Sequence, residues 1–217
     1  KIKKKTQKMS SVATATANEI TLRGSTQIVT EFFGYSINSI LYQRGIYPPE
    51  TFSRAQKYGL TMMVTSSPAL QDYLNKILGQ LSEWLIGGQV QKIVLAISSV
   101  ETKETLERWT FNVETDQDSL STGKTQEKSE KVIMGEIQAI IRQITASVSF
   151  LPLLQENCTF DMLIYTNNDA QIPNTWEETD AKFIANQQDV RLRSFTTKVH
   201  KVDAMVSYKG DDGDDEI

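Results

Sequence analysis

Apolar residues recur at intervals of three and four in three segments of the chain, the pattern of an amphipathic helix. The segments span residues 25–45, 67–87 and 127–147. Ser25 and Ser67 precede the first two apolar stripes, and serine is a residue type that caps helix N-termini. Packing against a hydrophobic core explains each stripe, so the pattern predicts three helices with one buried face each.

Continuous or alternating apolar runs predict strands at residues 92–99, 106–114 and 160–166. The first two runs are separated by a short polar turn, which predicts a hairpin. Strands joined by short connections pair antiparallel, and helices with one apolar face cover such a sheet. The predicted fold class is therefore α+β, with helices packed on a mainly antiparallel sheet.

The C-terminal part of the domain has a different pattern. Residues 167–188 form a long polar stretch with few apolar positions, and alternation follows at 190–194 and again at 202–208. The phase of the alternation breaks near Ser194, which predicts two β-segments with a bulge or kink there. Long loops in compact domains tend to be functional or disordered. A hairpin on such a tether can sit at more than one place on the sheet.

Three segments lack a folded pattern. Residues 1–18 begin with KIKKKTQK, which we expect to be upstream sequence before a natural start at Met9, or else a short basic localisation signal. Residues 210–217, GDDGDDEI, form an acidic tail that we expect to be disordered, like residues 1–18. A polar patch at 114–131 predicts a flexible loop. Residues 19–209 are then one domain.

Composition narrows the possible chemistry. The 217 residues include one cysteine and one histidine, which excludes a disulfide within the chain, a Cys-rich zinc site and a His-based metal cluster. The formal net charge of −4 does not favour a nucleic-acid surface, and no apolar run approaches the roughly 20 residues that span a bilayer. No segment has the layout of a secretory signal, so we expect a reducing, intracellular compartment.

The individual reactive side chains favour structural roles. Cys158 precedes a core strand and is predicted to be a buried, small apolar residue. His200 is predicted to be a partly exposed strand residue and not a base, and Asp161 and Asp169 belong to a strand and the turn after it. Motifs such as GxGxxG and GxSxG are absent from the sequence. A binding module is favoured, and an enzyme using Asp161, Asp169 or His200 is the least favoured alternative.

Several longer runs then indicate a family. They are ITLRGSTQIVTEFFGYSINSILYQRGIYPPETF, QKYGLTMMVT, LERWTFNVE, IRQITASVSFLPLL, FDMLIYT and DVRLRSFTTKVHKV. In this order, between Ile20 and Lys209, they closely resemble the HORMA-domain proteins of the spindle assembly checkpoint, the mitotic arrest deficient two family. Other HORMA adaptors, those of the translesion polymerase and the meiotic axis, are the alternative. The loop at 116–126 and the stretch at 167–188 depart most from the family pattern.

The resemblance implies a HORMA domain whose C-terminal part, residues 168–209, is a mobile safety belt. It implies an adaptor that is not an enzyme and uses no cofactor or metal, in the nucleus, at the kinetochore and in the cytoplasm. The implied partners are the kinetochore recruiter mitotic arrest deficient one, the activator subunit of the anaphase-promoting complex, a second copy of the chain in another conformation, and a HORMA-remodelling AAA ATPase with its comet adaptor. Direct contact with nucleic acid or membrane is not implied.

The resemblance also implies two sets of site residues. Self-association would use a surface around the end of the third helix, formed by Arg142, Gln143, Phe150 and Arg44. Capture of a partner's motif would use the strand at 160–166 and aromatic residues near it, namely Phe160, Leu163, Tyr165, Trp84 and Trp176. Structural roles stay open for several of them: the two tryptophans and Phe150 could be core residues, and Arg142 could oppose the helix dipole.

Overall fold

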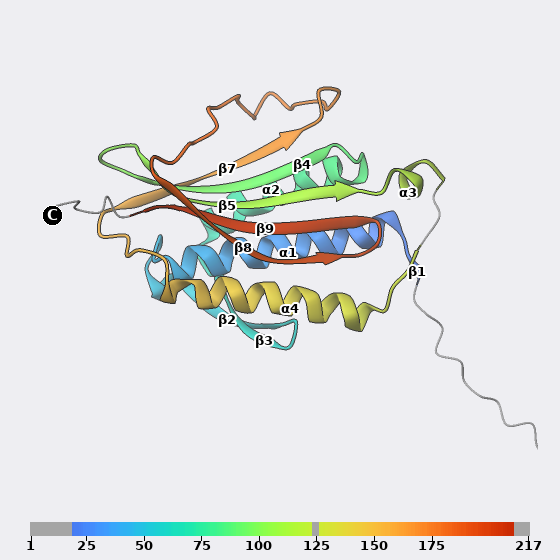
Figure 1. Ribbon diagram of the computed structural model, residues 1–217, viewed down its shortest axis with the longest axis horizontal. Helices are drawn as coiled ribbons and strands as arrows, with labels where there is room; N and C mark the ends of the chain where they lie inside the picture. The colour runs from blue at the N-terminus through green and yellow to red at the C-terminus, as the bar shows by residue number, and fades with distance from the viewer. Residues whose placement is uncertain (1–18, 123–125, 211–217) are drawn as a thin grey trace, which may run out of the picture.

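A five-stranded antiparallel sheet forms the centre of the computed structural model, which describes residues 19–122 and 126–210 (Figure 1). The strand order is β7-β4-β5-β9-β8. The bounds are β4 (Val90–Ser99), β5 (Thr105–Thr115), β7 (Cys158–Thr166), β8 (Gln187–Thr196) and β9 (His200–Lys209). Every neighbouring pair is antiparallel, as the short connections predicted.

The helices α1 (Leu22–Gln43), α2 (Pro68–Ile86) and α4 (Glu130–Ala146) lie on one face of this sheet (Figure 1). Aromatic rings join the layers: Phe32 on α1 contacts Phe111 on β5 and Phe195 on β8, with ring centroids 5.9 and 4.8 Å apart. These rings are at most 1% exposed. The α+β prediction is confirmed, and the three apolar stripes pack in the core as expected.

The helix ends show how local chemistry sets boundaries. Ser67 is the N-cap residue of α2, as predicted. The N-cap of α1 is not Ser25 but Thr21, whose hydroxyl accepts a hydrogen bond from the Gly24 N–H at 3.0 Å. The prediction was wrong because Thr21 satisfies a free backbone donor one turn earlier, which leaves Ser25 inside the helix and buried.

Smaller elements were not predicted. A hairpin of β2 (Phe52–Lys57) and β3 (Leu60–Thr65) turns through Tyr58 and Gly59, which have φ of 53° and 67°. A glycine between two short segments is the signal that could have revealed this turn. A short pair joins β1 (Glu19–Ile20) to β6 (Gln126–Glu127), and single turns of 3₁₀ helix occur at η1 (Pro49–Thr51) and η2 (Ser147–Ser149).

The polar patch at 114–131, in which a flexible loop is predicted, includes short elements that the sequence pattern did not predict. Helix α3 (Gln117–Thr122) lies within it, and Asp116 caps that helix by accepting hydrogen bonds from the N–H and hydroxyl of Ser119. Residues 123–125 lie outside the described residues. Asp, Ser and Thr are common in loops, but the same side chains also start short helices.

The C-terminal segments match the predicted pattern. The stretch from 167 to 186 forms neither helix nor strand, and β8 and β9 form a hairpin whose register shifts between Arg191 and Ser194. The predicted bulge near Ser194 is confirmed. The predictions for residues 1–18 and for most of the acidic tail fall outside the described residues.

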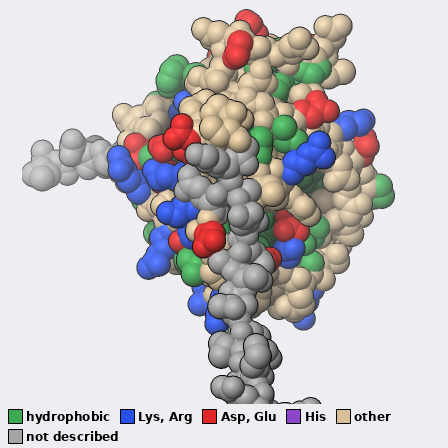
Figure 2. Space-filling model, turned by 90° about the vertical axis from the view of Figure 1, so that its right-hand side faces the viewer, with side chains coloured by type: hydrophobic (Ala, Val, Ile, Leu, Met, Phe, Trp, Pro, Cys, Tyr) green, Lys and Arg blue, Asp and Glu red, His purple; other side chains and the backbone are tan. Residues whose placement is uncertain are grey.

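The described surface agrees with the modest net charge. On the face seen in Figure 2, Lys and Arg side chains are intermingled with Asp and Glu side chains. Within residues 19–122 and 126–210, no helix is long and apolar enough to cross a membrane.

Candidate functional site

The outer edge of β7 is an unpaired sheet edge. One side of β7 pairs with β4, with Leu163 opposite Val94, and the register shifts only between Val90 and Lys92. On the other side, no strand of the described residues pairs with it. The loop at 167–186 runs back along this side of β7 (Figure 1). An edge of this kind presents backbone donors and acceptors to any chain that can lie beside it.

The first half of this loop is fastened to α2 through aromatic contacts. The Trp84 indole N–H donates to the carbonyl of Gln171 at 3.1 Å, and the Trp84 and Trp176 rings meet edge to face with centroids 5.1 Å apart. Asn167 donates its backbone N–H to Gln89 at 2.8 Å. Trp84 is 4% exposed, so the same side chain packs in the core and holds the loop.

The second half of the loop is held by an ion pair between Lys182 and Asp161 of β7, whose atoms are 3.0 Å apart. Between the two fastenings lies a cavity of about 650 Å³, lined by the second half of β7, by Trp84 and by loop residues that include Trp176. A loop fixed at both ends over an unpaired edge can enclose a segment that lies along that edge.

The predicted motif-binding residues do not share one surface. Leu163 and Tyr165 line the cavity with Trp84 and Trp176. Phe160 does not: its ring packs against Tyr47 and Tyr73, 6.2 and 5.8 Å away, in the core under the helices. Successive side chains of a strand point to opposite faces of the sheet, so Phe160 lies on the opposite face from Leu163 and Tyr165.

The predicted self-association residues are only partly brought together. Arg142 is exposed on α4, and Phe150, 46% exposed, follows the end of the same helix. The side chain of Gln143 is engaged within the chain, because its Oε1 accepts the backbone N–H of Arg193 on β8 at 2.6 Å. Arg44 is buried and does not share the surface of Arg142.

Arg44 belongs to an internal ion pair. Its Nε donates to Glu107 Oε2 at 2.8 Å, and its Nη2 donates to the carbonyl of Pro152 at 2.5 Å. Trp109 donates its indole N–H to the other carboxylate oxygen at 2.5 Å. Burial raises the pKa of Glu107, and the charge of Arg44 opposes that rise. The cluster joins the end of α1 to the middle of the sheet.

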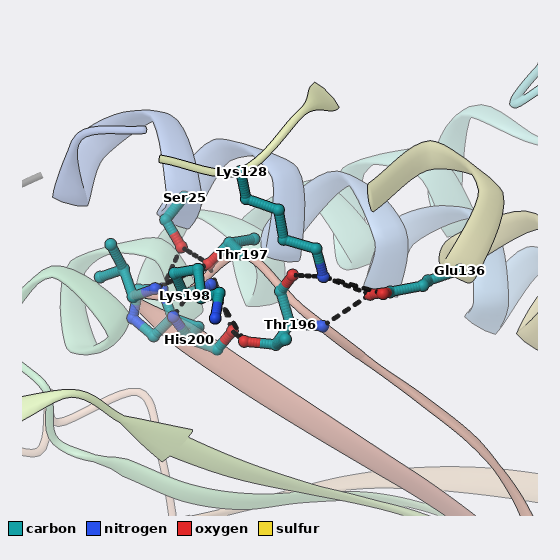
Figure 3. A network of polar contacts seen from close by, with 8 residues as sticks. Ser25, Lys128, Glu136, Thr196, Thr197, Lys198 and His200 are labelled. Carbon is teal, nitrogen blue, oxygen red and sulfur yellow. Dashed lines mark hydrogen bonds and ion pairs between the residues drawn. The ribbon is translucent and has the colours of Figure 1, made fainter. Parts of the chain in front are cut away.

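His200 lies at the start of β9 in a polar network that the sequence analysis missed (Figure 3). It is fully buried, which corrects the prediction of a partly exposed strand residue. Its Nδ1 lies 2.6 Å from Ser25 Oγ, which lies 2.5 Å from Thr197 Oγ1. The prediction failed because the alternation along a strand indicates which face of the sheet a residue lies on. It does not indicate that the ends of two helices cover the hairpin turn.

A second contact holds the same turn to α4 (Figure 3). Glu136 accepts the backbone N–H of Thr196 at 3.1 Å, and Lys128 joins the Glu136 carboxylate to the Thr196 carbonyl at 2.7 Å from each. With Gln143, this means that α4 side chains accept two backbone N–H groups of β8. The hairpin is therefore docked on α4 as well as paired with β5.

The remaining candidates for chemistry do not assemble. Cys158 is half-buried and not fully buried as predicted, and burial raises the pKa of its thiol, which disfavours the nucleophilic thiolate. The described residues contain no group of three or more His, Cys, Asp or Glu side chains that could hold a metal ion. Asp161 is used in the ion pair with Lys182.

Comparisons with known proteins agree with this geometry. A mitotic spindle assembly checkpoint protein MAD2A from Dictyostelium discoideum is 60% identical over 197 residues, covering 91% of this chain and 97% of the relative. A chain in a crystal structure of the mitotic checkpoint complex has a TM-score of 0.77 at 43% identity, over 86% of this chain and 99% of that chain.

A more distant structure shares the fold. Caenorhabditis elegans HTP-2, bound to a closure motif of HTP-3, has a TM-score of 0.67 at 15% identity and covers 88% of each chain. The family model described as the HORMA domain matches residues 25–200. The chain belongs to the HORMA-domain family.

Proposed function

We propose that this protein is a spindle assembly checkpoint adaptor that captures a short partner motif as an added strand on the outer edge of β7. The unpaired edge beneath the fastened loop is the observation that carries the proposal. Identity of 60% to a spindle checkpoint protein and similarity to a chain of the mitotic checkpoint complex support the checkpoint role. Capture of the activator of the anaphase-promoting complex would delay anaphase.

The physics of strand addition suits this site. Main-chain hydrogen bonds to β7 supply affinity that depends little on the partner's sequence, and side-chain pockets on alternate sides supply specificity. Leu163 and Tyr165 provide one such pocket wall. The loop at 167–186 then acts as the part of the belt that crosses the captured strand, because its two fastenings prevent that strand from leaving sideways.

The position of the hairpin supports the closed state of the proposed switch. Here β9 pairs with β5, so the hairpin lies at the end of the sheet away from β7. In the open state that we propose, the hairpin covers the β7 edge itself, which protects that edge from aggregation. Two packings of one sequence must then lie within a few kcal/mol of each other. Exchange requires breaking the pairing of a whole strand and is expected to be slow.

The partners that we propose are protein chains. They are the kinetochore recruiter mitotic arrest deficient one, the activator subunit of the anaphase-promoting complex, a second copy in the other state, and a HORMA-remodelling AAA ATPase with its comet adaptor. We place the protein in the nucleus, at the kinetochore and in the cytoplasm. Residues 168–209 would be the belt.

Capture can be measured with synthetic peptides of the recruiter and activator motifs by fluorescence polarisation. Replacing Trp176, which is half-buried, by Ala removes the contact with Trp84 and is expected to weaken binding about tenfold or more, the effect of losing an aromatic anchor of a binding site. Phe183→Ala is the matched control, since Phe183 is an aromatic residue of the same loop that is 80% exposed. Absence of binding to both peptides by the unaltered chain would reject the proposed function.

Self-association gives a separate prediction. Arg142→Glu reverses a charge on the exposed face of α4 and is expected to yield a folded monomer that still binds the motif peptides. Analytical ultracentrifugation and the polarisation assay measure the two properties. Lys131→Glu, at an exposed position on the same helix, is the control. Unchanged dimerisation of the Arg142 variant would remove this face from the proposed interface.

A further inference from the structure

The turn between β8 and β9 enters a buried polar socket formed by three parts of the chain. Ser25 on α1, Thr197 in the turn and His200 on β9 are each fully buried. The His200 Nε2 lies 3.3 Å from the carbonyl of Leu85, next to the C-terminus of α2. The socket therefore connects the hairpin to α1 and α2 at positions far apart in the sequence.

The hydrogen-bond partners of His200 determine which ring nitrogen carries the proton. A carbonyl only accepts, so the His200 Nε2 carries the hydrogen that is donated to Leu85, and in the neutral ring Nδ1 must accept from the Ser25 hydroxyl. The Ser25 oxygen then accepts from the Thr197 hydroxyl, whose oxygen accepts the backbone N–H of His200 at 2.9 Å. With a neutral imidazole, every member of this series of hydrogen bonds, from the Leu85 carbonyl to the hairpin turn, has a partner.

Within residues 19–122 and 126–210, the side-chain nitrogens of His200 contact a hydroxyl and a backbone carbonyl and form no ion pair, so a positive charge on the ring would have no direct counterion there. Burial lowers the pKa of His200 to about 4, and the Leu85 carbonyl opposes this only in part. Arg23 on α1 and Lys198 in the turn are exposed. Glu83 on α2 accepts from Gln80, and Glu114 on β5 pairs with Lys201 on β9. Asp116, after β5, accepts from Ser119, and Glu136 on α4, which accepts the backbone N–H of Thr196, pairs with Lys128.

We propose that Ser25 and His200 are positioning residues that hold the hairpin on the β5 side, and that this hold requires a neutral imidazole, so that acidification releases the hairpin from this position. The inference rests on the second hairpin position of the proposed function. An exposed ring titrates near 6.5. A histidine whose pKa is lowered in one position of the hairpin favours that position as long as the ring is neutral. This stabilisation is fully present above the pKa of the exposed ring and is lost as the pH falls towards about 4, the pKa of the buried ring.

A distance across the sheet reports the hairpin position at any pH. Asp189 on β8 and Asp161 on β7 lie in one row of paired residues that crosses the sheet through Ser207, Arg108 and Ala96. Four strand spacings place the ends of this row about 19 Å apart. Asp161 is kept because it pairs with Lys182, so the second label is placed at Thr159, two residues away on the same strand and about 7 Å along it. The offset lengthens the expected separation by only about 1 Å. Spin labels on Asp189→Cys and Thr159→Cys, both exposed positions, in a Cys158→Ser background measure this separation by double electron–electron resonance.

The full chain is equilibrated at pH 7.5 and at pH 5 before freezing. The ratio of the population near 19 Å to the remainder is expected to fall about 30-fold at pH 5, which follows from the two pKa values. In His200→Gln, which cannot titrate, the ratio should change less than about twofold over the same range. Ser25→Ala should lower the ratio about fivefold at pH 7.5, the effect of one lost hydrogen bond, and Ser25→Thr should restore it.

Ser53→Ala, an exposed serine of β2, is the matched control and should behave as the unaltered chain. A pH-independent ratio in the unaltered chain, or a 30-fold fall that persists in His200→Gln, would overturn the inference. If His200→Gln does not fold, as judged by circular dichroism, the Ser25 pair of variants decides the matter. If the motif peptides bind at pH 7.5 but the ratio does not change with pH, the inference about the socket is rejected and the proposed function stands. If the peptides do not bind but the ratio falls with pH as expected, the proposed function is rejected and the inference about the socket stands.

Discussion

Replacing Glu107 by Ala is expected to lower the free energy of unfolding by about 3–5 kcal/mol, because it leaves a buried guanidinium without its counterion. Glu107 is 1% exposed and accepts hydrogen bonds from both Arg44 and Trp109. Urea unfolding followed by circular dichroism measures the change. No other single ion pair of the described residues has two side chains that are both at most 3% exposed.

The double variant Arg44→Met with Glu107→Leu separates charge burial from packing. Because both charges are removed together, it is expected to recover most of the lost stability. Glu104→Ala is the matched control, since Glu104 pairs with Lys209 at the surface and such pairs contribute less than about 1 kcal/mol. Equal effects of the Glu107 and Glu104 variants would contradict the structural role of the buried pair.

Replacing Phe195 by Ala is expected to cost about 3–5 kcal/mol, the usual effect of deleting a buried ring and leaving a cavity. Phe195 is 1% exposed, and its ring centroid lies 4.8 Å from that of Phe32 on α1. It is the side chain through which β8 enters the aromatic core. The loss should act mainly on the hairpin, because the other rings of that cluster belong to α1 and β5.

Hydrogen exchange distinguishes local release from global destabilisation. In Phe195→Ala, the amides of β9 should exchange faster than those of β4, whose pairing partners β5 and β7 are intact. Leu192→Ala is the control, since Leu192 lies on the same strand but is only half-buried and should cost about 1 kcal/mol. Equal acceleration in β4 and β9 would show that the hairpin does not open as a separate unit.

The same residues show what a pattern can and cannot predict. The apolar alternation of Val202, Ala204 and Val206 predicted a strand with one buried face, and these residues are at most 4% exposed. The alternation says nothing about which neighbour the strand takes, because a period of two is satisfied at either end of the sheet. His200 and Ser25 were misjudged for a related reason: they are 175 positions apart, and no local periodicity reports a contact at that separation.

The site residues divide in the same way. Resemblance grouped five residues for motif binding. The structure puts Trp84, Trp176, Leu163 and Tyr165 around one cavity but packs the fifth, Phe160, in the core. Resemblance also grouped Arg44 with Arg142, whereas the structure buries Arg44 against Glu107. A side chain long enough to reach either the surface or the sheet cannot be assigned from its place at a helix end, since the tertiary partner decides which way it turns.

The sequence by itself determined the three long helices, the core strands, the long polar loop and the family, because hydrophobic periodicity and extended motifs are local properties of the chain. Only the tertiary structure decided that the hairpin lies beside β5, that the outer edge of β7 is unpaired and that one buried histidine closes the turn. The physical reason is that strand choice and the burial of polar groups depend on contacts between residues far apart in the sequence, which no local periodicity reports.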